Sequence, residues 1–279
     1  MNSRADQHHW REQISRLFAG PIDASLRIAV LAAHPDDETI GASALLAHAK
    51  HPLVIFLTDG APRDQKLWSP DFHGERGEYA DVRRREAVAA LSHAGIGAEQ
   101  LCWLGAIDQE AIFVVHDLVE GLSELLAQHR PDVLITHPYE GGHPDHDTAA
   151  LVAWLAGAQF DEGDAPTHLE MTSYHARARQ CVTGEFLDSN SDEEISLQLT
   201  PADRDRKRRM LDAYASQCLV LSAFDTTQER WRKAPQYDFS RLPHAGKLWY
   251  ECMGWPMTGD KWRSLAAEKI AAMQEQSCR

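Results

Sequence analysis

Short runs of apolar residues alternate along the chain with longer segments that carry apolar residues at helical spacing. The apolar runs cover residues 26–31, 53–57, 101–104, 131–136 and 169–174. Each run is apolar at most positions, which is typical of strands covered on both faces of a sheet. The segments with helical periodicity cover residues 38–50, 78–93, 110–129 and 146–157. This alternation predicts an α/β fold with a doubly wound, mainly parallel sheet and right-handed crossovers.

The regular alternation ends near residue 180. Residues 188–194 are acidic and polar, and residues 195–199 alternate in polarity like an exposed strand. Pro201 opens a charged segment that predicts a helix to about residue 217. The tail that follows carries four tryptophans, which indicates a packed segment that covers the sheet edge or the mouth of a site.

Length and pattern together predict one domain over residues 1–279. We expect a core at about residues 26–180 and a C-terminal extension at about residues 181–279 that packs on this core. A weakly amphipathic segment at residues 10–18 predicts one more helix on the outside of the domain.

Composition favours a soluble protein. Lysine and arginine number 28 against 42 aspartates and glutamates, a net charge of −14, and the basic residues are scattered, which argues against a nucleic-acid partner. The five cysteines are far apart, so neither a disulfide framework nor a cysteine zinc site is indicated. No segment approaches the roughly 20 apolar residues that cross a bilayer. We expect a cytoplasmic protein without a membrane partner, and a homo-oligomer is compatible with the sequence.

Ionisable residues gather at two places where a predicted strand passes into a predicted helix. The first junction (residues 33–38) contains His34, Asp36 and Asp37, and it follows the first strand. The second junction (residues 143–147) has the sequence His-Pro-Asp-His-Asp, and it follows the fourth strand. Ligands bind at the carboxyl ends of the strands in an open parallel sheet. We therefore expect the two junctions to face one site.

Two histidines and one aspartate are enough for a catalytic zinc site that keeps a coordination position open for water. We predict that His34, Asp37 and His146 are the metal ligands, with iron(II) as an alternative to zinc. Asp36 is then free to act as a general base and later as an acid. His143 is placed to donate to an oxyanion or to orient the base through Asp145.

Simpler explanations apply to several neighbouring residues. Glu38 fits a first-turn glutamate that the helix dipole favours. Residues 83–85, three arginines, fit a solvated helix face, with the alternative that Arg83 reaches the pocket. Residues 58–60 fit a turn, and His137 at the end of the fourth strand is compatible with either a structural or a site role. Aromatic residues of the loop after the second strand, at positions 68, 72 and 79, fit either loop anchoring or stacking on a sugar ring.

The sequence Ala-His-Pro-Asp-Asp-Glu at residues 33–38, together with Gly-His-Pro-Asp-His at 142–146, resembles the two signature motifs of the PIG-L/LmbE-like zinc deacetylases. The resemblance extends through residues 58–60, the helix with Arg83 and residues 207–217. It implies a Rossmann-like fold and hydrolysis of the N-acetyl group of an amino sugar or its glycoconjugate.

The same resemblance implies roles for individual residues. It makes His34, Asp37 and His146 zinc ligands, Asp36 the base and then the acid, and His143 the histidine that stabilises the oxyanion or acts as an acid. Some members place a tyrosine two residues before that histidine, where this chain has Gly141. Tyr139 is a candidate to substitute for it.

Other classes of protein share parts of this pattern. Two histidines and one carboxylate also make a mononuclear iron oxygenase site, but such motifs are familiar on all-β barrels. A dinucleotide-binding enzyme would need a glycine-rich loop after the first strand, and His-Pro-Asp-Asp stands there instead. A sugar-binding module that holds a metal without turnover would have no need for Asp36.

Overall fold

The computed structural model describes residues 26–161, 163–188 and 194–277 and places seven strands in one sheet. The order is β3 (Leu101–Ala106), β2 (Leu53–Thr58), β1 (Ile28–Ala32), β4 (Val133–Thr136), β5 (Thr167–Met171), β9 (Gln228–Lys233) and β8 (Glu194–Gln198). The first five strands are parallel, and the last two are antiparallel to their neighbours. The predicted α/β fold with a mainly parallel sheet is confirmed. The helix predicted at residues 10–18 and most of the acidic segment at 188–194 lie outside the described residues.

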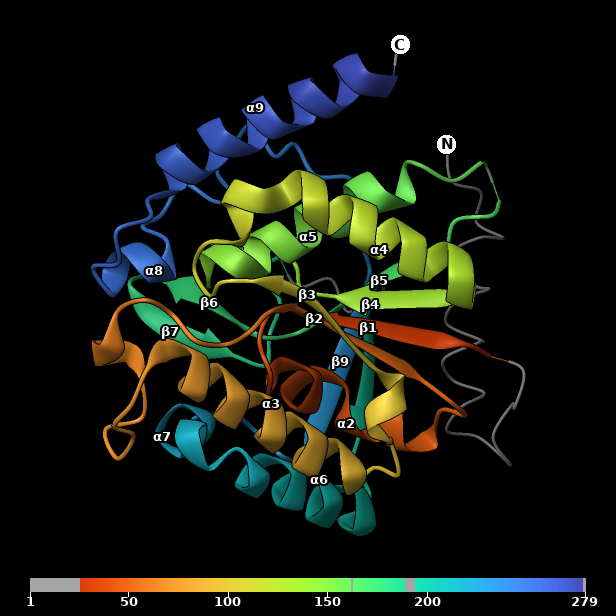
Figure 1. Cartoon of the computed structure of the whole chain (residues 1–279), viewed down its shortest axis with the longest axis vertical. Helices are drawn as coiled ribbons and strands as arrows, with labels where there is room; N and C mark the ends of the chain where they lie inside the picture. Colours follow the sequence, from red (N-terminus) through yellow and green to blue (C-terminus); the bar gives the residue numbers. More distant parts are fainter. Residues whose placement is uncertain (1–25, 162, 189–193, 278–279) are drawn as a thin grey trace.

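Helices cover both faces of the sheet (Figure 1). The helices of one face are α4 (Val115–His129), α5 (Pro144–Gly157) and α9 (Gly259–Ser277), and those of the other are α2 (Asp37–His48), α3 (Arg76–Ser92) and α6 (Pro201–Ala213). Residues of β1 and β2 alternate between the two hydrophobic cores, so the central strands are fully buried. This burial explains why their sequences are apolar almost throughout.

The segment after residue 171 departs from the simple alternation. The run at 169–174, expected as one strand, is broken because β5 ends at Met171 and a separate hairpin of β6 (Tyr174–Arg177) and β7 (Gln180–Thr183) begins at Tyr174. Strand β8 confirms the exposed strand expected at 195–199, and β9 was not expected. The short helices α7 (Cys218–Leu221) and α8 (Trp249–Cys252) follow, at the same side of the molecule as the hairpin (Figure 1). The single-domain organisation stays a prediction.

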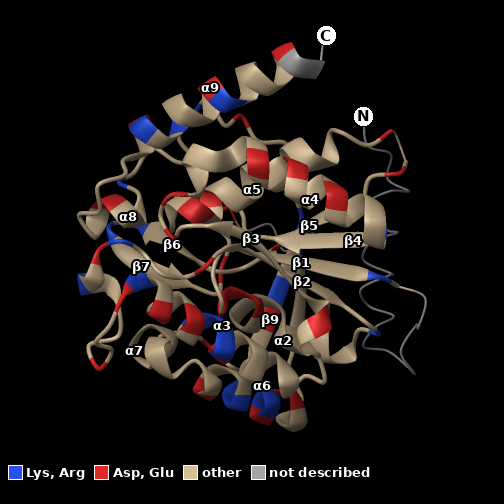
Figure 2. Ribbon diagram, viewed as in Figure 1, with Lys and Arg blue, Asp and Glu red and all other residues tan. Residues whose placement is uncertain are grey.

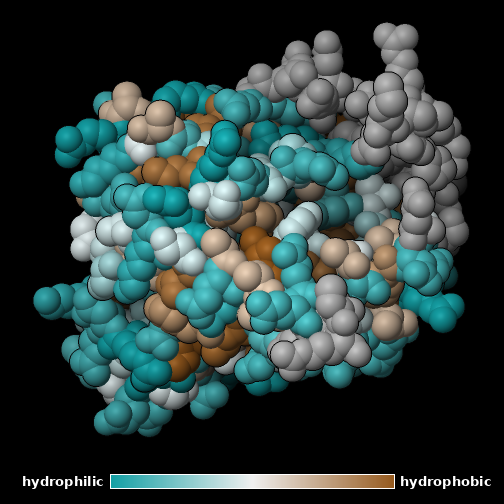
Figure 3. Space-filling model, turned by 90° about the horizontal axis from the view of Figure 1, so that it is seen from above, coloured by the Kyte–Doolittle hydropathy of each residue, from teal (hydrophilic) through white to brown (hydrophobic). Residues whose placement is uncertain are grey.

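The surface carries charges of both signs. Basic and acidic residues both occur on α3, α6 and α9 (Figure 2), and the face shown in Figure 3 is mainly hydrophilic, with hydrophobic residues near its centre and toward its lower left. Within the described part of the chain, every helix is too short or too polar to cross a membrane.

Candidate metal centre and active site

Three loops at the carboxyl ends of parallel strands meet in one cavity of about 460 Å³. The first junction leaves β1 at the centre of the sheet, and the loop after the neighbouring strand β4 leads to the second junction. Asp108, which sequence reasoning missed, follows β3 on the other side. The charged and imidazole side chains that line the cavity among the described residues are His34, Asp36, Asp37, Arg83, Asp108, His143 and His146. The two junctions therefore face one site, as their positions after neighbouring strands predict.

Asp37 lies between the two histidines that were predicted to share a metal with it. Its Oδ2 is 3.2 Å from Nδ1 of His34, and its Oδ1 is 3.3 Å from Nε2 of His146. Among the described residues, two compact groups of potential ligating atoms contain His146, one with His34 and His143 and the other with Asp37 and His137, and a third in the same cavity joins His34, Asp108, His143 and Asp145. The predicted ligand set spans these two overlapping groups. Nε2 of His146 is buried without a hydrogen-bond partner, which suits an atom that binds a metal.

His34 faces carboxylates with both of its ring nitrogens. Nδ1 points at Asp37, and Nε2 is 3.2 Å from Asp108 and 3.2 Å from Asp145. Burial lowers the pKa of His34, but the carboxylates outweigh it and the pKa is raised well above its usual value. The site is thus rich in negative charge and favours a cation.

His143 forms the N-cap of α5 with its own side chain. The backbone N–H of Asp145 donates to Nδ1 of His143 at 3.1 Å, so Nδ1 is an acceptor and a neutral ring carries its proton on Nε2. Burial and the neighbouring histidines lower the pKa of His143 well below its usual value. His143 lines the cavity, and its Nε2 lies 3.7 Å from Oδ1 of Asp108. His143 is therefore a neutral hydrogen-bond donor toward the cavity.

The carboxylate of Asp145 serves His34 more directly than His143. Asp145 Oδ2 is 3.2 Å from Nε2 of His34 but 3.8 Å from Nδ1 of His143. The same carboxylate accepts from the backbone N–H groups of Gln109 at 2.5 Å and Ala111 at 3.2 Å. The structure thus places Asp145 where it orients a predicted ligand and ties the loop after β3 to α5, rather than where it orients the base through His143.

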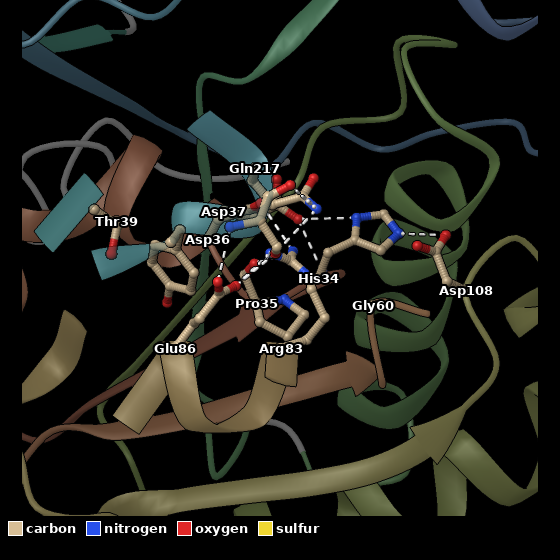
Figure 4. A network of polar contacts seen from close by, with 12 residues as sticks. His34, Pro35, Asp36, Asp37, Thr39, Gly60, Arg83, Glu86, Asp108 and Gln217 are labelled. Carbon is tan, nitrogen blue, oxygen red and sulfur yellow. Dashed lines mark hydrogen bonds and ion pairs between the residues drawn. The ribbon is translucent and has the colours of Figure 1, made fainter. Parts of the chain in front are cut away.

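Asp36 sits in a strained backbone conformation with φ 136°, which a residue with a side chain rarely adopts. Arg83 reaches it from α3, and Nη2 donates to Oδ2 of Asp36 at 2.9 Å and to the carbonyl of Pro35 (Figure 4). Gly60 lies against this contact, because a Cβ there would meet Pro35 at 2.8 Å and Arg83 at 3.0 Å. Burial raises the pKa of Asp36 to about 7, although Arg83 opposes the shift.

Arg83 corrects the interpretation of residues 83–85 as a solvated helix face. Its side chain is only 2% exposed, because it pairs with Asp36 and lies 3.5 Å from Glu86. Arg84 and Arg85 are exposed, as a solvated face requires. The alternative, that Arg83 reaches the pocket, is the one that the structure shows.

Glu38 is fully buried, so the helix dipole alone does not account for it. Its Oε2 accepts from the backbone N–H of Asp36 at 3.0 Å. Its Oε1 accepts from the hydroxyls of Thr39 at 2.6 Å and Tyr214 at 2.5 Å. Glu38 therefore braces the strained backbone of Asp36 and links it to the C-terminal extension.

Helix α2 is interrupted at Ala42, where the backbone leaves the helical region. Side chains from α6 and β9 form hydrogen bonds with the backbone groups that lose their helical partners at this break. Lys207 donates to the carbonyl of Ile40 at 2.6 Å and to Glu229 at 3.1 Å, and Glu229 accepts from the hydroxyl of Ser43 at 2.5 Å. Both ions are fully buried. The helix that begins with Asp37 is thus held by residues far along the chain.

His137 and Asp108 join the site beside the predicted residues. The ring of His137 stacks on that of His146 at 3.9 Å, and its Nε2 accepts from the backbone N–H of Ala33 at 3.1 Å. Asp108 Oδ1 is buried without a hydrogen-bond partner, close to His34. The signal for Asp108 was its place soon after the third strand, where a carboxylate reaches the same edge of the sheet.

Tyr139 does not replace the tyrosine missing at position 141. Its hydroxyl donates to the carbonyl of Arg241 at 2.7 Å and its ring packs against Trp262, outside the cavity. Gly141 has φ 71°, and a Cβ would meet the Leu248 side chain at 2.6 Å, so a tyrosine at this position would be strained and would displace Leu248. Tyr174 of β6 lines the cavity instead, with its ring 5.1 Å from that of His146.

The aromatic residues after β2 pack on one another. Trp68 stacks on Tyr79 at 5.1 Å, Phe72 closes the cluster, and Trp68 Nε1 donates to the carbonyl of Pro62 at 2.8 Å. This arrangement supports the loop-anchoring interpretation. Of residues 58–60, expected as a turn, Thr58 is the last residue of β2 and Gly60 forms a bend, and the Thr58 hydroxyl donates to the carbonyl of Ala33.

The core of the chain matches a known family. Residues 29–156 match the model described as "PIG-L: GlcNAc-PI de-N-acetylase". A mycothiol S-conjugate amidase of Streptomyces coelicolor is 28% identical over 179 residues, which cover 56% of this chain and 58% of that protein. A 1D-myo-inositol 2-acetamido-2-deoxy-alpha-D-glucopyranoside deacetylase of Thermomonospora curvata is 30% identical over 153 residues, which cover 47% of this chain and 52% of that protein. The chain thus spans about half the length of these curated relatives.

Solved structures share the fold at low sequence identity. The zinc-inhibited form of the teicoplanin deacetylase Orf2 superposes with a TM-score of 0.54 at 14% identity and covers 76% of this chain and 99% of that one. The 4-carboxy-2-hydroxymuconate hydratase GalB of Pseudomonas putida superposes with a TM-score of 0.54 at 16% identity. The match covers 76% of this chain and 98% of that one. Because a deacetylase and a hydratase both share it, the fold alone does not define the reaction.

Proposed function

We propose that this chain is a metal-dependent hydrolase that removes the N-acetyl group from an amino sugar or its glycoconjugate, because residues 29–156 match the PIG-L family model. The observation that supports this most directly is Asp36, a braced carboxylate beside the Asp37 and His34 pair in a cavity of substrate size. Water supplies the oxygen of the acetate that leaves, and the sugar keeps a free amine.

His34, Asp37 and His146 would hold the metal. Two imidazoles and one carboxylate suit zinc, and the excess of carboxylates around His34 and the unpartnered Nε2 of His146 fit a bound cation. When bound, zinc would lower the pKa of a coordinated water to about 7 and polarise the amide carbonyl. Asp145 would orient His34 as the outer partner of a metal ligand.

Asp36 takes the proton of the attacking water. Arg83 holds its Oδ2, so the other carboxylate oxygen remains for the water. The water oxygen adds to the acetyl carbon, the carbon–nitrogen bond breaks, and Asp36 returns the proton to the amine that leaves. A positioned general base contributes about 10²- to 10⁴-fold to the rate.

His143 stabilises the oxyanion as a neutral donor. The backbone N–H of Asp145 occupies Nδ1, which leaves the Nε2–H directed at the cavity. A donor fixed in this way needs no reorganisation when charge develops on the carbonyl oxygen. This role follows from the capping geometry of α5 and does not require a charged imidazole.

Acetate release from N-acetylated amino sugars, measured on metal-free protein with and without zinc, tests the reaction. We expect zinc-dependent acetate release, and D36N should lower kcat by at least 100-fold while the bound zinc remains stoichiometric. Asparagine has the size and shape of aspartate and keeps one oxygen to accept from Arg83, so the loss reports the missing base rather than a rebuilt site.

Asp81→Asn, on the exposed side of α3, is the matched control and should retain full activity. Near-normal kcat in D36N would contradict the assignment of the base. Turnover that requires oxygen and iron(II) would support the iron oxygenase instead. Bound sugar and zinc without acetate release would support a binding module.

A further inference from the structure

The cavity that holds the site has an apolar rim. Nine large hydrophobic side chains are exposed among the described residues, and four of them line this one cavity. They are Leu219 (74% exposed), Val220 (57%), Met253 (51%) and Leu67 (36%). They come from three separate segments: α7, the end of α8 and the 3-10 turn Gln65–Leu67. The apolar surface is therefore gathered around the mouth of the cavity from different parts of the fold.

The charged side chains that line the cavity lie at its buried end, away from this exposed apolar rim. Every charged or imidazole side chain that lines the cavity among the described residues belongs to the candidate metal centre or contacts it. Arg83 is already paired with Asp36 and the Pro35 carbonyl, so it is not available to a substrate anion at the rim. Phe224, Trp249 and Trp255 continue the apolar wall inward, and Trp255 packs on His143 at 4.8 Å.

Among the neutral polar side chains of the same lining, Thr183 donates to the Ala223 carbonyl and Gln217 to the Tyr79 hydroxyl. A hydroxyl-rich or anionic group at the rim would therefore find few free hydrogen-bond partners. Hydroxyls and carboxylates lose water when they are buried and need hydrogen-bond partners in return, which leucine, valine and methionine side chains do not provide. An apolar group gains free energy in the same place, because it covers side chains that are otherwise exposed to water. The polar end accommodates an N-acetyl sugar, and the rim accommodates what is attached to it.

We propose that the substrate is an N-acetylated amino sugar whose attached group is an alkyl or aryl aglycone, and that this aglycone lies on Leu219, Val220, Met253 and Leu67. The inference rests on the proposed deacetylase function and narrows it to amphipathic glycosides. The continuity of the rim with the reaction site in one cavity identifies the substrate itself, rather than a separate partner, as the occupant.

A series of N-acetylglucosamine glycosides tests the proposal. Acetate release by the zinc-loaded full chain is measured with methyl, butyl and octyl glycosides of both anomers, each below its micelle concentration. We expect kcat/KM to rise at least tenfold from methyl to octyl, mainly through KM, because the aglycone contributes binding that is uniform along the reaction. Equal kcat/KM across the series would overturn the proposal.

Variants locate the effect on the rim. L219S and V220S should each lower the octyl-to-methyl ratio of kcat/KM by about threefold or more, and the double variant by more than either. V88S is the matched control, since Val88 is an exposed valine on α3 outside the cavity, and it should keep the ratio. A ratio that survives in L219S/V220S would place the aglycone elsewhere and overturn the assignment of these residues.

Calorimetric binding of the octyl and methyl glycosides separates failure of this inference from failure of the reaction. Octyl-selective binding that is lost in L219S, with no acetate from any glycoside, would reject the deacetylase and keep the aglycone site. Acetate release without octyl preference would keep the deacetylase and reject the aglycone site. Binding of neutral phosphatidylcholine vesicles or dimer formation that depends on Leu219, without octyl preference, would also reject it.

Discussion

Residues 33–38 and residues 143–147 both present histidine and aspartate to the same cavity, but their backbones differ. At the second junction His143 is extended, with φ −136° and ψ 142°, Pro144 opens the helix, and the His143 ring caps it. At the first junction Asp36 has φ 136° and gives no side-chain cap to α2. One junction is a regular helix start, and the other is a strained turn.

The difference in backbone is matched by a difference in what holds each junction. At the second, near neighbours in sequence close the turn, since Asp147 accepts from Gly141 and the Thr148 hydroxyl donates to the Pro144 carbonyl, while Asp145 and Pro144 also receive bonds from Gln109 and Trp262. The first depends on residues far along the chain, namely Arg83 and Tyr214, while Lys207 and Glu229 hold the helix that follows. Strain at the base is therefore sustained by tertiary contacts, as is common where function needs an unusual geometry.

The largest expected effect on stability comes from Lys207→Met. The substitution leaves Glu229 as a buried carboxylate without its cation and the Ile40 carbonyl without its donor. We expect the free energy of unfolding, measured in urea at pH 7, to fall by about 3–5 kcal/mol. R208M, which removes a neighbouring cation from the exposed pair with Asp205, should change stability by less than about 0.5 kcal/mol. A loss below about 1 kcal/mol for K207M would show that α2 does not depend on this ion pair.

Tyr214→Phe sharpens the comparison at the first junction itself. It removes one donor from the buried Glu38 and leaves the ring in place. A hydrogen bond to a charged group is worth about 1.5–3 kcal/mol, so we expect a loss of stability in this range together with a lower kcat at similar KM. Y79F removes a tyrosine hydroxyl that contacts Ser69 and Gln217, and it should leave kcat intact. Unchanged kcat and stability in Y214F would argue that Glu38 braces Asp36 without help from the extension.

The smallest effect is expected for Thr148→Val at the second junction. The hydroxyl bonds only neutral groups, the Pro144 carbonyl and Trp262 Nε1, and Trp262 keeps its second contact with that carbonyl. We expect a loss of about 0.5–1.5 kcal/mol in thermal unfolding and a kcat within about twofold of the parent. A fall in kcat as large as that of Y214F would break the distinction between the two junctions.

The polarity pattern of the sequence predicts those elements whose burial is uniform along the element. The apolar runs predict the five parallel strands because both faces of each central strand are buried. Strand β9, with the sequence Gln-Glu-Arg-Trp-Arg-Lys, lacks such a run, and two of its charged residues, Glu229 and Arg232, are paired inside the protein. The presence of β9 in the sheet was therefore not readable from polarity alone.

The same limit applies to the site. The meeting of the two junctions was predictable, because β1 and β4 are neighbours in the sheet and their carboxyl ends share an edge. The burial of Arg83 and Glu38 was not, because a charged residue is buried only where tertiary partners satisfy it. Their partners Asp36 and Tyr214 are 47 and 176 residues away.

The braces of α2 also set the time at which the site is completed during synthesis. Ile40 and Lys207 are 167 residues apart, and Ser43 and Glu229 are 186 residues apart. At about 5–20 residues per second, a ribosome finishes the first junction roughly 10–40 s before it has made the partners that hold it. The nascent chain therefore carries the complete Asp-Asp-Glu motif through most of its synthesis without the groups that shape it for catalysis.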